Sequence, residues 1–248
     1  MLLRVSKKRD WPSAEFPFSV PAVRAFSSLE LGAVTFFVGE NGSGKSTLLE
    51  AIATVAELPS LGGDGETLAS QRELGAHLRL SWSPRTRAGF FMRAEDFFGY
   101  LKLQARIDAR IVRERRENDG HVGPLFDDNA RHIDEVRAAR HLGRYDARSH
   151  GESFLELFKD RVRRGLYLLD EPEAPLSPTR QLALLHLLRD RSREGAQFVI
   201  ATHPPILLAC PGAKIVSFDR APIAEVAYED LEHVAITRAF LNDPSRFT

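Results

Sequence analysis

The sequence predicts an α/β fold with a mostly parallel sheet, helices on both of its faces, N-terminal antiparallel strands and an inserted helical lobe. Short, continuous apolar runs at 34–38, 166–169 and 198–201 are typical of buried parallel strands. Amphipathic helical patterns alternate with these runs, which is the order that places helices on both faces of such a sheet. Residues 93–148 are rich in Arg and Glu and predict the helical lobe.

We expect a single domain over residues 1–248, with an α/β core made of 1–92 and 149–248 and the lobe inserted between them. Hydrophobic periodicity and turn residues place the other elements. They are helices at 46–58, 152–163, 179–193 and 231–241, strands at 77–82, 89–92, 214–218 and 223–227, and a loop at 59–66.

Composition excludes some classes of protein. The 34 basic and 34 acidic residues cancel, so global charge does not favour nucleic acid or an anionic membrane as a partner. A single cysteine, Cys210, forms no intrachain disulfide and fits a reducing compartment. Apolar runs fall well short of the roughly 20 residues that a membrane helix needs. We therefore expect a cytoplasmic protein that does not itself insert into a membrane.

Residues 39–47 read Gly-Glu-Asn-Gly-Ser-Gly-Lys-Ser-Thr and follow the first apolar strand. Glycines at these positions let the backbone N–H groups turn toward phosphate oxygens at the start of a helix. Lys45 supplies a positive charge to the β- and γ-phosphates, and the Ser46 hydroxyl can ligate Mg²⁺. The residues expected to bind ATP here are Gly39, Asn41, Gly42, Ser43, Gly44, Lys45, Ser46 and Thr47.

A second strand, 166–169, ends in the carboxylates Asp170 and Glu171. Parallel strands deliver their carboxyl ends to one edge of the sheet, so these side chains should meet the phosphate loop. We expect Asp170 to hold Mg²⁺ through water and Glu171 to orient or deprotonate the attacking water. The prediction is an enzyme that hydrolyses ATP to ADP and phosphate. A nucleotide kinase is the alternative on the phosphate loop alone, but the carboxylates fit hydrolysis better.

The order of the phosphate loop, a Ser-x-Gly-Glu segment, Asp-Glu-Pro and Thr-His resembles the ABC-type ATPase superfamily of P-loop NTPases. Within it, 170–174 and 201–206 are similar to compact bacterial AAA-family ATPases related to SMC, RecF and OLD-type heads. The resemblance covers 34–58 and 149–208 well and the middle lobe poorly.

The resemblance implies further site residues. Ser149, Gly151 and Glu152 match the signature segment, which caps a helix facing the γ-phosphate bound by the opposite subunit, although His150 stands where the family has its first glycine. A homodimer around two Mg·ATP is therefore expected, also because this helix has no evident use within one chain. His203 resembles the switch histidine that contacts the γ-phosphate and the attacking water.

Two positions of the family pattern stay open. The stretch 89–96 should carry a glutamine but contains none, and Arg93 or Glu95 could take over its contact with the metal or water. For the aromatic residue that stacks on adenine, Trp11, Phe16 and Phe18 are the candidates. Packing in the apolar core is the alternative for each of them.

The process that hydrolysis drives is left with three alternatives. A nucleic-acid transaction or defence is favoured by Asp-Glu-Pro-Glu-Ala and by Ser177, where transporter subunits carry an aspartate, but neutral charge and the lack of a long coiled-coil insertion count against it. The alternatives are the energy subunit of a membrane transporter, which needs a separate partner protein, and a nucleotide switch with low turnover.

Overall fold

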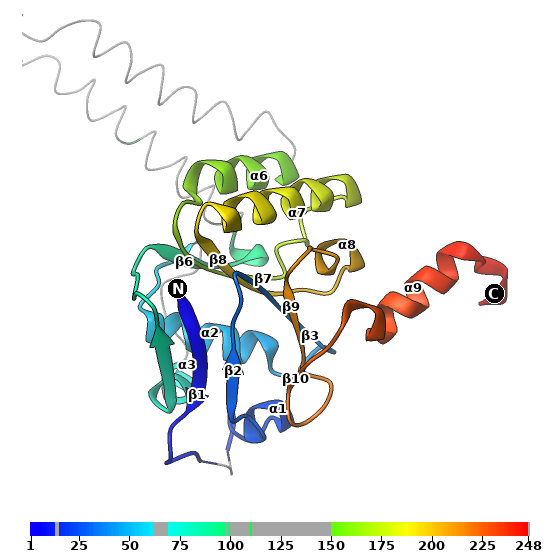
Figure 1. Cartoon of the computed structure of the whole chain (residues 1–248). Coiled ribbons are helices and arrows are strands. Elements are labelled where there is room, and N and C mark those ends of the chain that lie inside the picture. The colour runs from blue at the N-terminus through cyan, green and yellow to red at the C-terminus, as the bar shows by residue number, and fades with distance from the viewer. Residues whose placement is uncertain (13–14, 62–68, 98, 100–109, 111–149, 248) are drawn as a thin grey trace, which may run out of the picture.

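A computed structural model describes residues 1–12, 15–61, 69–97, 99, 110 and 150–247 (Figure 1). The lobe expected at 93–148 lies mostly outside these residues, so the lobe and the division of the chain into core and lobe remain predictions.

The main sheet is mostly parallel, as predicted. Within the described residues its strand order is β10-β9-β3-β8-β7-β6-β4, and only the pairing of β10 with β9 is antiparallel. Its strands are β3 (Val34–Val38), β4 (Ser60–Leu61), β6 (Gly89–Arg93), β7 (Gly165–Asp170), β8 (Ala196–Ala201), β9 (Lys214–Ser217) and β10 (Ala224–Glu225).

The expected N-terminal antiparallel strands form a second, smaller sheet. It pairs β2 (Ser28–Glu30), β1 (Leu2–Lys7) and β5 (Leu78–Trp82) in the order β2-β1-β5. The buried Gln197 amide joins the two sheets, because it accepts the Leu2 N–H at 2.7 Å and donates to the Leu2 and Gly32 carbonyls.

Helices cover both faces of the main sheet (Figure 1). One face carries α2 (Lys45–Ala56) and α3 (Ala69–Ala76), with α1 (Pro21–Arg24) and the smaller sheet. The other carries α6 (His150–Arg161), α7 (Pro178–Arg193) and α8 (Pro205–Leu208). Helix α9 (Glu232–Asn242) follows the short 3₁₀ turn Tyr228–Asp230, and a second 3₁₀ turn, Pro244–Arg246, comes after it. Each face has its own apolar core.

The expected helix and loop after the phosphate loop differ in detail from the structure. Helix α2 ends at Ala56, because Glu57 adopts a left-handed conformation with φ of 58°. The expected loop contains β4, whose Ser60 pairs with Phe91 of β6. Helix α3 was not expected at all. A strand of two residues and a helix of eight are too short to give a clear hydrophobic period.

Alternation along β7 decides which way its last residue points. Leu166 and Leu168 pack in the core beneath α2, whereas Tyr167 and Leu169 pack beneath α7. Because side chains alternate with a period of two, Asp170 turns toward α2 at the carboxyl edge of the sheet. The strand therefore places a carboxylate beside the start of the helix that follows the phosphate loop.

Candidate nucleotide-binding site

The phosphate loop runs from Gly39 to Gly44 between β3 and α2. Gly39 has φ of 144°, and a Cβ atom there would lie 2.9 Å from Asp219 Oδ1. Asp219, just beyond β9, accepts the Glu40 N–H at 2.7 Å and so fastens the start of the loop. Sequence reasoning missed Asp219, because no motif marks a residue 179 positions away from its partner.

Lys45 is buried at the first position of α2. Its Nζ donates to the carbonyl oxygens of Gly39 at 2.6 Å and Glu40 at 2.9 Å. Burial lowers the pKa of the ammonium group, and the carboxylates of Glu171 and Asp170 oppose that shift. The ammonium group is thus folded over the loop whose N–H groups are expected to hold phosphate.

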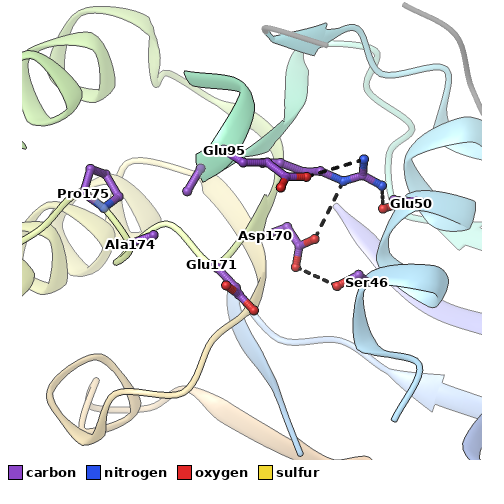
Figure 2. A pocket seen from close by; sticks show the side chains of 9 residues that line it. Ser46, Glu50, Glu95, Asp170, Glu171, Ala174 and Pro175 are labelled. Atoms are coloured by element: carbon purple, nitrogen blue, oxygen red, sulfur yellow. Dashed lines mark hydrogen bonds and ion pairs between the residues drawn. The ribbon is translucent and has the colours of Figure 1, made fainter. Parts of the chain in front are cut away.

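Ser46 and Asp170 come together as predicted. The Ser46 hydroxyl donates to Asp170 Oδ1 at 3.0 Å (Figure 2). Burial raises the pKa of the Asp170 carboxyl, which the hydrogen bond from Ser46 and the charge of Arg93 counteract.

These two oxygens fit a magnesium ion that shares its ligands with a nucleotide. Both are hard oxygen donors of the kind that Mg²⁺ prefers. Within the described residues, no cluster of three or more His, Cys, Asp or Glu side chains could hold a metal by itself. Mg²⁺ usually takes one or two protein oxygens and completes its shell with water and phosphate. Ser46 and Asp170 would provide the two protein oxygens.

A cavity of about 480 Å³ opens beside this pair (Figure 2). Most of its polar lining is acidic. It is lined by Ser46, Glu50, Arg93, Ala94, Glu95, Asp170, Glu171, Ala174 and Pro175.

Glu171 lines the same cavity and has an exposed side chain. Its φ is 50°, a left-handed conformation that few residues other than glycine adopt. Its N–H donates to the Ala201 carbonyl of β8 at 2.9 Å, which extends the pairing of β7 with β8 by one residue. Strained backbone of this kind is common at functional sites.

His203 lies just past the end of β8, and Glu173 holds it there. The Glu173 carboxylate accepts the His203 N–H at 3.0 Å and the Thr202 hydroxyl at 2.8 Å. His203 Nε2 is buried, with no hydrogen-bond partner in the described part of the chain. Burial, and then the charge of Lys45, lower the pKa of the imidazole, so the neutral ring is favoured. The sequence did not indicate that Glu173 binds His203.

Of the signature residues, Ser149 lies outside the described part of the chain. Gly151 is buried, and a Cβ atom on it would lie 2.9 Å from the Pro175 carbonyl oxygen. Glu152 forms an ion pair with Arg180 of α7 at 3.1 Å. The expectation that this helix has no use within one chain is therefore wrong, because its first turn packs on the segment after Glu171. Neither Gly151 nor Glu152 lines the cavity at Asp170.

The remaining loop residues and the aromatic candidates differ in exposure. Asn41 and Gly42 are exposed, Thr47 is partly buried, and the buried Ser43 Oγ has no hydrogen-bond partner in the described residues.

Phe18 is buried, and Trp11 packs against it with ring centroids 5.3 Å apart, so both belong to the core. Phe16 is 59% exposed. It lies four residues before Val20 in the chain, and Val20 approaches within 3.0 Å of the position that a Gly44 Cβ atom would take.

A protein-family comparison decides the class to which the chain belongs. The family described as "AAA domain, putative AbiEii toxin, Type IV TA system" matches residues 34–111 and 154–209, more than half of the chain. The chain belongs to this family. It is an ABC-type P-loop ATPase that binds ATP.

Two curated relatives of the ATPase are also named as ATP-binding proteins. It is 30% identical over 226 residues to the hemin import ATP-binding protein HmuV of Nocardia farcinica, covering 83% of this chain and 71% of the relative. It is 24% identical over 197 residues to the glutamine transport ATP-binding protein GlnQ of Escherichia coli, covering 78% and 79%. No helix in the described part of the ATPase has the length and apolar character needed to cross a bilayer.

Solved structures with a similar fold include the SMC head domain from Thermotoga maritima, at 15% identity and a TM-score of 0.43, covering 91% of this chain and 98% of that one. Another is a putative metal-chelate type ABC transporter in an inward-facing conformation, at 18% identity and a TM-score of 0.49, covering 97% and 88%.

Proposed function

We propose that Lys45, Ser46, Asp170, Glu171 and His203 bind and hydrolyse Mg·ATP. The observation that carries the proposal is the 3.0 Å contact between Ser46 Oγ and Asp170 Oδ1, which brings the phosphate loop to a strand-end carboxylate. Ser46 and Asp170 hold the metal, which supplies positive charge to the phosphates when bound. Lys45 leaves the loop carbonyls and neutralises the β- and γ-phosphate oxygens.

In this proposal Glu171 activates the attacking water. The water oxygen forms a bond to the γ-phosphorus as the bond from that phosphorus to the β–γ bridging oxygen breaks, and the proton of the water passes to the Glu171 carboxylate. Neutral His203 directs its free Nε2 at the γ-phosphate or the water. The products are ADP and inorganic phosphate.

We also propose that two copies of the chain enclose two ATP molecules. Gly151 and Glu152 do not line the cavity of their own chain. In this proposal the start of α6, together with Ser149, approaches the γ-phosphate bound by a second copy. The contact of Gly151 with the segment that follows Glu171 supports coupling between the two ATP sites.

For the process that hydrolysis drives, we propose the energy subunit of a membrane importer. The two relatives described above are a hemin import ATP-binding protein and a glutamine transport ATP-binding protein. The alignment covers more than two thirds of the length of each relative. Such a subunit needs a separate membrane partner, which accords with the lack of a membrane-spanning helix among the described residues. The relatives favour this alternative over a nucleic-acid transaction.

A second candidate is an ATPase of cellular defence. The description of the matching family names a putative AbiEii toxin of a type IV toxin–antitoxin system. This candidate needs no membrane partner, and induced expression of the chain alone should arrest growth in a manner that depends on Lys45.

ATPase assays test the proposal. Lys45→Ala is expected to abolish nucleotide binding or turnover, with Lys214→Ala, on β9, as the matched control. Unchanged activity in Lys45→Ala would overturn the site. Isolation of the tagged chain from detergent-solubilised native membranes should recover a polytopic partner. Strong stimulation by DNA that disappears with salt would instead favour the nucleic-acid alternative.

A further inference from the structure

Arg93 reaches the Asp170 carboxylate from the neighbouring strand. It is the last residue of β6, and its Cα pairs with that of Asp170 at the end of β7. The guanidinium forms an ion pair with Glu50 of α2, and its Nε lies 3.9 Å from Asp170 Oδ2. The ion pairs that reach Glu50 and Asp170 are among the dashed lines of Figure 2.

The guanidinium is fixed in this place by its surroundings. The Glu50 side chain is only 7% exposed, and a buried carboxylate without a partner is strongly unfavourable, so Glu50 holds Arg93 firmly. The Phe91 ring, on the same face of β6, lies 5.8 Å from the Arg93 Cζ atom. Glu95 is mostly exposed and lies 4.0 Å from the guanidinium, at the edge of the ion-pair range. Glu50 is therefore the principal anchor of Arg93.

The charges around the cavity indicate the role of the Arg93 guanidinium beside Asp170. Glu50, Glu95, Asp170 and Glu171 line the cavity, and Arg93 is the only cationic side chain among the described residues of the lining. Without Arg93, the metal-free Asp170 carboxylate would have Lys45 as its nearby cation and the carboxylates of Glu50, Glu95 and Glu171 around the same cavity. With Arg93, the carboxylate keeps an opposite charge on one oxygen and the Ser46 hydroxyl on the other.

We propose that Arg93 is a positioning residue of the metal site: it holds the Asp170 carboxylate in the metal-free protein and yields it to Mg²⁺ when Mg·ATP binds. The proposal rests on the proposed function, because it takes Asp170 as the metal-holding carboxylate. It resolves the choice between Arg93 and Glu95 in favour of Arg93, acting through Asp170 and not on the attacking water. Since two cations then compete for one carboxylate, Arg93 weakens metal binding.

The test measures binding and not turnover. A fluorescent ATP analogue is titrated with the 248-residue chain at increasing Mg²⁺, and again in EDTA without metal. Arg93→Met removes the charge and keeps much of the length of the side chain. We expect it to lower the half-saturating Mg²⁺ concentration about tenfold, the scale of a partly screened charge interaction. Arg93→Lys should keep the wild-type value within about threefold, because it keeps the charge.

Controls separate this role from a merely structural one. Arg4→Met removes an arginine from an exposed ion pair with Glu30. It should change neither the half-saturating Mg²⁺ concentration nor the affinity for the analogue in EDTA. If Arg93→Met fails to fold, as judged by its thermal melt, the double variant Glu50→Gln/Arg93→Met removes both charges of the pair. It leaves the net charge of the cavity lining as it was and should still lower the half-saturating Mg²⁺ concentration about threefold.

Two outcomes would overturn the proposal. One is an unchanged Mg²⁺ dependence in the folded Arg93 variants. The other is a loss of affinity for the analogue in EDTA with the Mg²⁺ dependence retained, which would make Arg93 a direct phosphate ligand. If the proposed ATPase function itself is wrong, the result differs from both of these outcomes. The wild-type chain would then bind the analogue equally well with Mg²⁺ and with EDTA, or would not bind it at all.

Discussion

The Glu173 carboxylate accepts a hydrogen bond of 3.0 Å from the main-chain N–H of His203, 30 residues further along the chain. Its second oxygen accepts the hydroxyl of Thr202, so one side chain from the segment after β7 fixes the residues that follow β8. Because Glu171 begins the same segment, the proposed base and the proposed switch histidine are held relative to each other. Their environments lead to predictions that can be measured separately.

The first prediction concerns His203 and acid pH. Its folded-state pKa is below the ordinary value of 6.5, so the folded protein prefers the neutral ring. Protons then bind the unfolded chain more readily, and the free energy of unfolding should fall as pH drops from 6.5 toward the lowered pKa. Above 6.5 this contribution is fully present. Urea unfolding of wild type and His203→Asn at pH 7.5 and 5.5 checks this, and a gap between the two proteins that does not change with pH would contradict it.

Glu171→Gln separates ATP binding from hydrolysis. The amide cannot take a proton from water, so turnover should fall about 10²–10⁴-fold, the usual contribution of a general base. Nucleotide binding should persist. With ATP and Mg²⁺, size-exclusion chromatography with light scattering should show a dimer. Glu194→Gln, which changes an exposed carboxylate paired with Arg191, is the control. A variant that stays monomeric at high protein and ATP concentrations would exclude the proposed ATP-enclosing dimer.

Asp170→Asn should stabilise the folded protein while it removes the carboxylate that is proposed to hold Mg²⁺. Burial raises the pKa of this carboxyl, so holding it ionised lowers folded-state stability as pH rises above its ordinary value of 3.8. An amide carries no such cost and can still accept the Ser46 hydrogen bond. We expect the Tm at neutral pH to rise by about 2–4 °C, the shift that about 1 kcal/mol gives in a domain of this size.

The same variant should lose the dependence of ATP binding on Mg²⁺. Calorimetry and nucleotide titration measure the two effects, and Asp160→Asn, on the exposed side of α6, is the matched control. A lower Tm together with intact Mg²⁺ dependence would contradict both the cost of burial and the assignment of Asp170 to the metal.

Phe16 is expected to stack on adenine, because it is the exposed aromatic of the segment beside Gly44. Phe16→Ala should weaken ATP binding about tenfold, within the roughly 1–3 kcal/mol that stacking of a base on an aromatic side chain contributes. Binding of inorganic triphosphate, which has no base, should not change. Phe247→Ala removes another exposed ring and serves as the control. Equal losses for ATP and triphosphate would point to damage of the loop instead.

The sequence predicted what depends on neighbouring residues. The spacing of Gly39, Gly44, Lys45 and Ser46 follows from the backbone geometry that a phosphate requires, and the apolar run before Asp170 marks a buried strand with a carboxylate at its end. Because parallel strands end at one edge of a sheet, the meeting of Ser46 with Asp170 could also be predicted.

Tertiary structure decided the contacts that no local pattern encodes. The ion pair of Arg93 with Glu50, the hold of Asp219 on the loop and the hold of Glu173 on His203 each join residues from separate elements. A charged residue in the sequence does not by itself indicate which distant residue it will contact. Only the packing of α2 on the sheet, and the order in which β6, β7 and β8 lie side by side, brought them close enough for charge and burial to fix their partners.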